Sequence, residues 1–82
     1  MRAQPMSVGN WISLNKTLVP LAAHDQVHAY RITNLGPDAV DVSSMEAGDF
    51  HLNAGESRDI EARFINVKAQ ASTAHGTYEF LD

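Results

Sequence analysis

"RITNLGPDAVDV", residues Arg31 to Val42, is the stretch that says most about the fold. Runs of alternating apolar and polar residues flank Asn34-Leu35-Gly36-Pro37 on both sides. Asn and Gly tolerate positive φ and Pro fixes its own φ, so these four residues predict a turn. We therefore expect a hairpin here. We also expect it to be only a corner of the scaffold, because turn geometry explains its Asn, Gly and Pro.

Alternation with a period of two continues in both directions and indicates strands. Turn-forming residues separate the alternating runs, and no window offers a capped helix of useful length. The stretch Asn15–Ala23 contains Pro20 and has no clean period, so we expect a connection there, with a short strand at most over residues 17–19. The expected strands cover residues 6–14, 25–33, 38–44, 50–52, 60–69 and 77–81.

One of these runs changes its parity. Its apolar residues first have even numbers and then odd numbers: Ile60, Ala62 and Phe64, followed by Ile65, Val67 and Ala69. Such a change inside a strand requires a β-bulge, or a bend at which the strand passes from one sheet to another. We therefore predict a bulge or a bend at Phe64-Ile65.

Together these features predict an all-β fold, a small antiparallel β-sandwich (Ig-like or jelly-roll-like) of about six or seven short strands. The chain has 82 residues, which suits one domain over residues 1–82. A domain of this size buries only about 60% of the surface of its unfolded chain, so its core supplies only ~3–5 kcal/mol. Disulfides cannot help because there is no cysteine. We therefore expect an oligomer, a larger assembly or an unusually well packed core.

Two groups of proteins resemble this pattern. Residues 26–64 resemble bacterial Ig-like and CARDB-like sandwich modules, and the matching residues are Asn34, Gly36, Pro37, Val40, Phe50, Leu52, Gly55, Glu56 and Ser57. The plan of the whole chain, with its closing "GTYEFL" strand over residues 76–81, is similar to that of small phage head-decoration or fibre-base proteins. These resemblances imply a structural or adhesive role without catalysis. Ig-like modules usually have about 100 residues, so the shorter chain is compatible with a missing edge strand and a sheet edge that a partner could fill.

The charge of the chain argues against two classes of partner. The net charge is −4, and the six basic residues are scattered along the sequence. We therefore expect neither a nucleic-acid partner, which needs a basic patch, nor attraction to an anionic membrane. The first 14 residues contain no apolar run of the length found in a secretory signal. We expect no signal peptide, and a virion and the cytoplasm are both compatible locations.

Histidine is the only plausible source of metal ligands in a chain without cysteine. On a strand, His24 and His28 would share a face but lie ~13 Å apart, which is too far to bind one metal. Met45 and His51 do not make a blue-copper centre, because that centre needs a cysteine thiolate. We therefore expect no metal and no other cofactor.

No set of catalytic residues can be assembled either. The serines lack a Gly-x-Ser-x-Gly elbow, and no phosphate-binding glycine loop precedes a helix. Asp25 with His28, or Asp49 with His51, could be drawn as dyads, but neighbouring Asp and His residues in loops are more common as turn formers. We predict that the protein is not an enzyme.

The aromatic residues divide into core and interface candidates. Five of them alternate with aliphatic neighbours, which favours core packing: Tyr30, Phe50, Phe64, Tyr78 and Phe80. Trp11 follows a Gly-Asn break and is either a core plug or an interface anchor, since Trp is enriched in interface hot spots. As interface residues we predict Met6, Val8, Trp11, Ile12, Tyr78 and Phe80, with residues 1–10 forming an arm that orders against a neighbour.

These observations predict a non-catalytic structural or interaction module with protein partners. It would be a subunit of a homo-oligomer or a larger assembly, and most specifically a virion decoration, minor capsid or attachment protein. One alternative is a monomeric module that binds a glycan or a metal through His24, His28, His51 and exposed aromatic residues. Another is a small inhibitor that binds an enzyme through its acidic face, with an association rate that falls steeply with salt.

Overall fold

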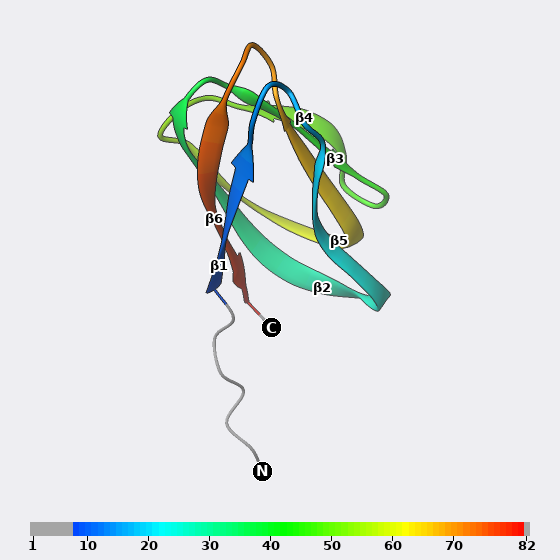
Figure 1. Cartoon of the computed structure of the whole chain (residues 1–82). Coiled ribbons are helices and arrows are strands. Elements are labelled where there is room, and N and C mark those ends of the chain that lie inside the picture. The colour runs from blue at the N-terminus through cyan, green and yellow to red at the C-terminus, as the bar shows by residue number, and fades with distance from the viewer. Residues whose placement is uncertain (1–7, 82) are drawn as a thin grey trace.

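The computed structural model describes residues 8–81, and within this range it defines all side chains except those of residues 8 and 22–25. These residues form one antiparallel sheet of six strands, in the order β1-β6-β2-β5-β3-β4 (Figure 1). The strands are β1 (Val8–Ser13), β2 (Val19–Pro37), β3 (Val40–Ser44), β4 (Gly48–Leu52), β5 (Ser57–Ala69) and β6 (Ala74–Phe80). The predicted all-β class is confirmed. None of the described segments is a helix that could cross a membrane.

The sheet folds over on itself because its two longest strands, β2 and β5, each take part in two layers. The first half of β5 pairs with the second half of β2, from Ser57 opposite Thr33 to Ala62 opposite His28. Further along β5, Val67 stands opposite a residue of β2 on one side and a residue of β3 on the other. The β1 layer therefore contains β1, β6, the second half of β2 and the first half of β5, and the β4 layer contains β4, β3, the second half of β5 and the start of β2 (Figure 1).

The bend predicted in β5 is confirmed. The buried side chains change from even numbers, ending at Ala62, to odd numbers, starting at Ile65. The neighbouring strand β2 shows register shifts between Pro20 and Ala22 and between Ala23 and His28. Phe64 was expected to share the buried face with Ala62, but it is 40% exposed. The reason is that the strand turns between these residues and leaves Phe64 on the outside of the bend.

The core lies between the two layers and receives buried apolar residues from all six strands. These residues are Trp11, Tyr30, Ile32, Val40, Val42, Leu52, Ile60, Ala62, Ile65, Val67, Ala69 and Ala74. Of the aromatic residues predicted for the core, Tyr30 is buried, and Phe50, Tyr78 and Phe80 are partly buried and pack against it. Four of the five core assignments are therefore confirmed, and only Phe64 is wrong.

The stretch from Arg31 to Val42 is not the hairpin predicted from its alternation. Its two strands, β2 and β3, are not neighbours, because β5 lies between them. Gly36 and Pro37 still belong to β2, and the chain leaves that strand only at Asp38. Alternation indicates two strands correctly, but it does not say that the second strand pairs with the first. The stretch is a corner between the two layers.

The stretch of residues 15–23, predicted to be a connection, consists of a turn followed by the first residues of β2. Asn15 and Lys16 form a turn with positive φ of 53° and 63°, and the Thr17 N–H donates to the Leu14 carbonyl at 3.1 Å. From Val19 onward the chain is already part of β2. Pro20 is tolerated because this part of β2 pairs with β5 alone, while the pairing with β6 begins only at residue 30.

Candidate functional site

The predicted interface residues that the structure describes lie on two neighbouring strands at one end of the sheet. Val8, Trp11 and Ile12 belong to β1, and Tyr78 and Phe80 belong to β6. The two strands pair without interruption over the whole of β1, which is the last strand on that side (Figure 1). Segments from opposite ends of the sequence are therefore side by side. Met6 lies outside the described residues.

Two reciprocal pairs of an aromatic residue and a glycine attach β1 to β6. Gly9 stands opposite Tyr78, and Trp11 stands opposite Gly76. A Cβ atom on Gly9 would lie 2.3 Å from Tyr78 Cζ, and one on Gly76 would lie 2.6 Å from Trp11 Cζ2. Each ring therefore lies over a glycine of the other strand, where only a residue without a side chain leaves room.

The pairing of Trp11 with Gly76 bears on the two alternatives for the tryptophan. Trp11 is 4% exposed, and its Nε1–H donates to the Thr77 carbonyl at 3.2 Å. This is the position expected of a core plug, and it leaves little surface for an interface. Phe80 also points toward the protein interior, with its ring centroid 5.5 Å from that of Tyr30.

Among the predicted interface residues whose side chains the structure describes, Ile12 is the one that is exposed. It is 54% exposed, as is Leu35 of β2. Both border a shallow hollow of about 430 Å³, whose lining residues are Asn10, Trp11, Ile12, Leu35, His75 and Gly76. We name this combination of a sheet edge, exposed aliphatic side chains and a hollow the β1 edge.

The predicted assembly arm overlaps with this edge. Of its residues 1–10, the structure describes Val8 to Asn10, and these three pair with Glu79 to Thr77 of the same chain. They are therefore part of the folded domain. Contact between residues 1–7 and a neighbour stays a prediction.

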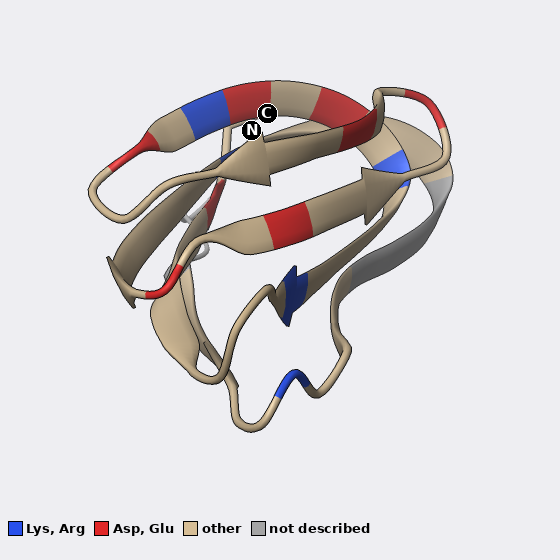
Figure 2. Ribbon diagram, turned by 90° about the horizontal axis from the view of Figure 1, so that it is seen from above, with Lys and Arg blue, Asp and Glu red and all other residues tan. Residues whose placement is uncertain are grey.

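Charged residues lie beside the β1 edge but not on it. Arg31 of β2 binds Asp59 of β5 through two hydrogen bonds of 2.7 and 3.0 Å, and its Nη1 lies 3.9 Å from Glu79 Oε1. These bonds lower the pKa of Asp59 and raise that of Arg31. Blue and red segments, which mark basic and acidic residues, alternate along part of the ribbon in Figure 2. In contrast, β1 carries no charged residue.

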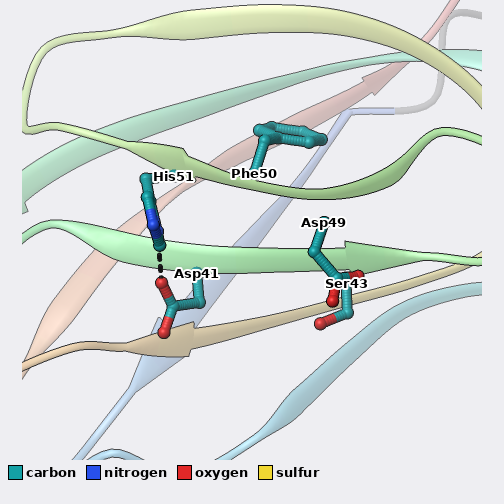
Figure 3. A pocket seen from close by; sticks show the side chains of 5 residues that line it. All are labelled: Asp41, Ser43, Asp49, Phe50 and His51. Atoms are coloured by element: carbon teal, nitrogen blue, oxygen red, sulfur yellow. Dashed lines mark hydrogen bonds and ion pairs between the residues drawn. The ribbon is translucent and has the colours of Figure 1, made fainter.

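A second candidate site lies at the opposite end of the sheet, on the outer face of β3 and β4. Asp41 and His51 are cross-strand neighbours, and His51 Nδ1 lies 2.5 Å from Asp41 Oδ1 (Figure 3). Gln70 Nε2 lies 2.7 Å from the same oxygen and 2.9 Å from His51 Nδ1. The Gln70 hydrogen bond, followed by that of His51, lowers the pKa of Asp41. A hollow of about 360 Å³ adjoins this cluster and is lined by Asp41, Ser43, Asp49, Phe50 and His51.

His51 is a residue that the sequence singles out, but its partner differs from the expected one. The pattern offers Asp49, two residues away, whereas the structure pairs His51 with Asp41 on the neighbouring strand. The register of β3 with β4 around the turn at residues 45–47 is what brings this pair together. The alternation of the two strands could have suggested the pair, but only if they had been recognised as a hairpin.

The histidines named for a metal or glycan site do not come together where the structure describes them. His28 is on β2, with its ring centroid 5.1 Å from that of Phe80, and β5 and β3 separate β2 from the strand of His51. The side chain of His24 lies outside the described part of the structure. Among the described residues, no group of three or more His, Cys, Asp or Glu could hold a metal ion.

Comparisons of this chain with protein-family models, with curated proteins and with solved structures find no match. Its function must therefore be inferred from the geometry of the chain itself. That geometry offers two surfaces, the apolar β1 edge and the polar hollow beside Asp41 and His51.

Proposed function

We propose that the protein is a non-catalytic structural module that acts through protein contacts, as a subunit of a homo-oligomer or a larger assembly. The observation that carries this proposal is the β1 edge. A strand at the end of a sheet presents unpaired N–H and C=O groups, which form a template for another strand. In this molecule that template lies beside the exposed side chains of Ile12 and Leu35.

The size of the domain supports the same proposal. Its core consists mainly of small and medium-sized aliphatic residues, with alanine at positions 62, 69 and 74. A core of this kind in a chain without disulfides gives limited stability. Burial of an exposed edge against another subunit would add stability by mass action.

The most specific form of the proposal is a virion decoration, minor capsid or attachment protein. Its support is the similarity in plan to small phage virion proteins, which are short, cysteine-free β-sandwiches that end in a strand like β6. An assembly role also suits a molecule that places β1 and β6, from its two ends, on one edge.

The experiment that tests the proposal is a measurement of absolute mass in solution. Light scattering on a sizing column, over a hundredfold range of protein concentration, should give a discrete oligomer. A monomer at every concentration would overturn self-assembly and leave two options: a subunit of a larger assembly with other proteins, or a function based on the second site.

The hollow beside Asp41 and His51 supports a second candidate function, the binding of a small polar ligand such as a glycan. Its lining offers carboxylate, hydroxyl and imidazole groups that can form hydrogen bonds, while the partly buried ring of Phe50 points away from them and packs against the core (Figure 3). Calorimetric titration with a glycan panel, and with Zn²⁺ and Cu²⁺ as metal probes, tests this candidate. Heat that disappears in the Asp41→Ala and His51→Ala variants would support it, and no heat with any probe would exclude it for those ligands.

A further inference from the structure

The two ends of the sheet differ in how they are protected. Natural edge strands are usually blunted by charges, prolines, bulges or covering loops, because an open edge pairs with other strands. The β4 edge carries Asp49 and begins at Gly48 with a φ of +78°. In contrast, β1 has six residues with no charge and no proline, and its register with β6 contains no bulge. The β1 edge is therefore the one suited to pairing.

The open part of β1 is shorter than the strand. Ser13 is fully buried, and its hydroxyl donates to the Thr17 carbonyl at 2.6 Å and accepts the Ala69 N–H at 3.0 Å. Beside it, the Lys16 N–H donates to the Ser72 carbonyl at 2.9 Å. These bonds tie the end of β1 to the end of β5 and, within residues 8–81, leave residues 8–12 as the open segment. The exposed Asn10 is the middle residue of that segment.

The residues around Asn10 are arranged so that the segment can complement a second copy of itself. In an antiparallel pair with a twofold axis at Asn10, each Asn10 stands opposite the other, and Val8 of each copy stands opposite Ile12 of the other. Cross-strand pairs of β-branched residues stabilise antiparallel strands. The two asparagine amides can both donate and accept a hydrogen bond across the axis.

The charge of the molecule also favours a second copy at this place. Each chain has a net charge of −4, so two copies repel each other wherever their acidic residues would meet. Pairing through β1 brings no charged residue of the strand into the seam. Pairing through β4 would bring Asp49 of each copy into the seam, where like charges are destabilising.

We propose that β1 of one copy pairs antiparallel with β1 of a second copy, in the register that places Asn10 opposite Asn10. The two six-stranded sheets then become one continuous sheet across a twofold axis. This inference rests on the proposed function, for which it names the partner and the strand register.

A charge exchange at residue 10 tests this register. In the dimer, Asn10→Lys places two lysines opposite each other, and Asn10→Asp places two carboxylates there. Because like charges repel, the dissociation constant of the dimer should be at least about tenfold higher for each variant alone than for the native chain. A 1:1 mixture of the two variants places lysine opposite aspartate, and the dimer should return. Asn53→Lys and Asn53→Asp are matched controls, because Asn53 is exposed in the turn between β4 and β5. These controls should dimerise like the native chain.

The measurement is the sedimentation-velocity mass of each sample, with thermal unfolding to show that each variant is folded. Dimers lost in both Asn10 variants and regained in the mixture would support the inference. Two results would overturn the inference and leave the proposed function standing. The first is a native oligomer that the Asn10 variants leave unchanged. The second is a dimer that both variants lose and that does not return when they are mixed. A native monomer at all concentrations would overturn the inference together with the homo-oligomer form of the proposed function, and would leave only its larger-assembly form.

Discussion

The side chain of Asn34 is fully buried and makes three hydrogen bonds to backbone groups. Its Nδ2 donates to the carbonyls of Asp38 and Leu52, each at 2.9 Å, and its Oδ1 accepts the Gly36 N–H at 2.8 Å. The amide thus joins the end of β2 to the chain entering β3 and to the end of β4. The prediction that this stretch is a scaffold corner agrees with these bonds, because they use both atoms of the amide. The sequence pointed to the corner through Gly and Pro, but it could not show the long-range bond to Leu52.

Replacement of this amide has a predictable cost. Asn34→Ala leaves two buried backbone groups and one partly buried group without this partner, and a buried unsatisfied group costs about 1–3 kcal/mol. We therefore expect a loss of about 3 kcal/mol or more in the free energy of unfolding, measured by denaturant titration. Asn53→Ala, in an exposed turn, should change it by less than about 0.5 kcal/mol. Similar stabilities for the two variants would contradict the role assigned to Asn34.

At the scale of the strands, the attachment of β1 to β6 depends on Gly76. A Cβ atom at this position would lie 1.9 Å from the Thr33 carbonyl oxygen of β2, as well as against the Trp11 ring. Neither the carbonyl nor the buried ring can move without separating β6 from a neighbouring strand. Gly76 is therefore required by packing, although its backbone needs no positive φ.

The Gly76→Ala variant should accordingly lose about 3 kcal/mol, at the upper end of what overpacking costs. Trp11 is the only tryptophan in the chain, so its fluorescence should shift toward that of an exposed indole as β1 detaches. Gly55→Ala is the comparison, because Gly55 has a φ of +88° but open space around it, and a strained φ alone costs about 1–2 kcal/mol. A smaller loss for Gly76→Ala than for Gly55→Ala would argue against the packing role.

The strands also show which features a sequence can predict. The bend in β5 was predictable because both of its halves keep an apolar face, and the change in parity is therefore visible. The partner of β3 was not predictable, since Val40 and Val42 would show the same alternation beside β2 or β5. The start of β2 was missed because Pro20 argues against a strand at this place. Pairing with β5, which is distant in the sequence, nevertheless holds the segment extended.

At the scale of the whole molecule, the β1 edge and the hollow beside Asp41 and His51 differ in how far the sequence predicts them. Ile12 could be chosen from the sequence because it is apolar in an N-terminal strand, but the burial of Trp11 depends on Gly76, 65 positions further along the chain. The cluster of Asp41, His51 and Gln70 was missed because it combines residues of β3 and β4 with a residue just beyond the end of β5. Polar residues on a strand carry no pattern that reveals which of them the register brings together.

Three carboxylates connect parts of the sheet across the whole molecule. Asp41 of β3 accepts a hydrogen bond from Gln70, beyond the end of β5. Glu46, between β3 and β4, accepts from the backbone and side chain of Arg63. Asp59 of β5 accepts from Arg31 of β2. These bonds lower the pKa of each carboxyl.

The direction of these pKa shifts predicts how stability depends on pH. A carboxyl whose pKa is lower in the folded than in the unfolded chain stabilises the fold above its unfolded pKa, and this contribution is lost as the pH falls through the folded pKa. The midpoint of thermal unfolding should therefore stay nearly constant down to about pH 5 and then decrease toward pH 2. Because the side chains of all three groups are partly exposed to solvent, 1 M NaCl should reduce the decrease. Asp59→Asn should also reduce it, because that variant lacks one of the three titrating groups. A midpoint that rises on acidification over this range would show that these bonds do not determine the acid response.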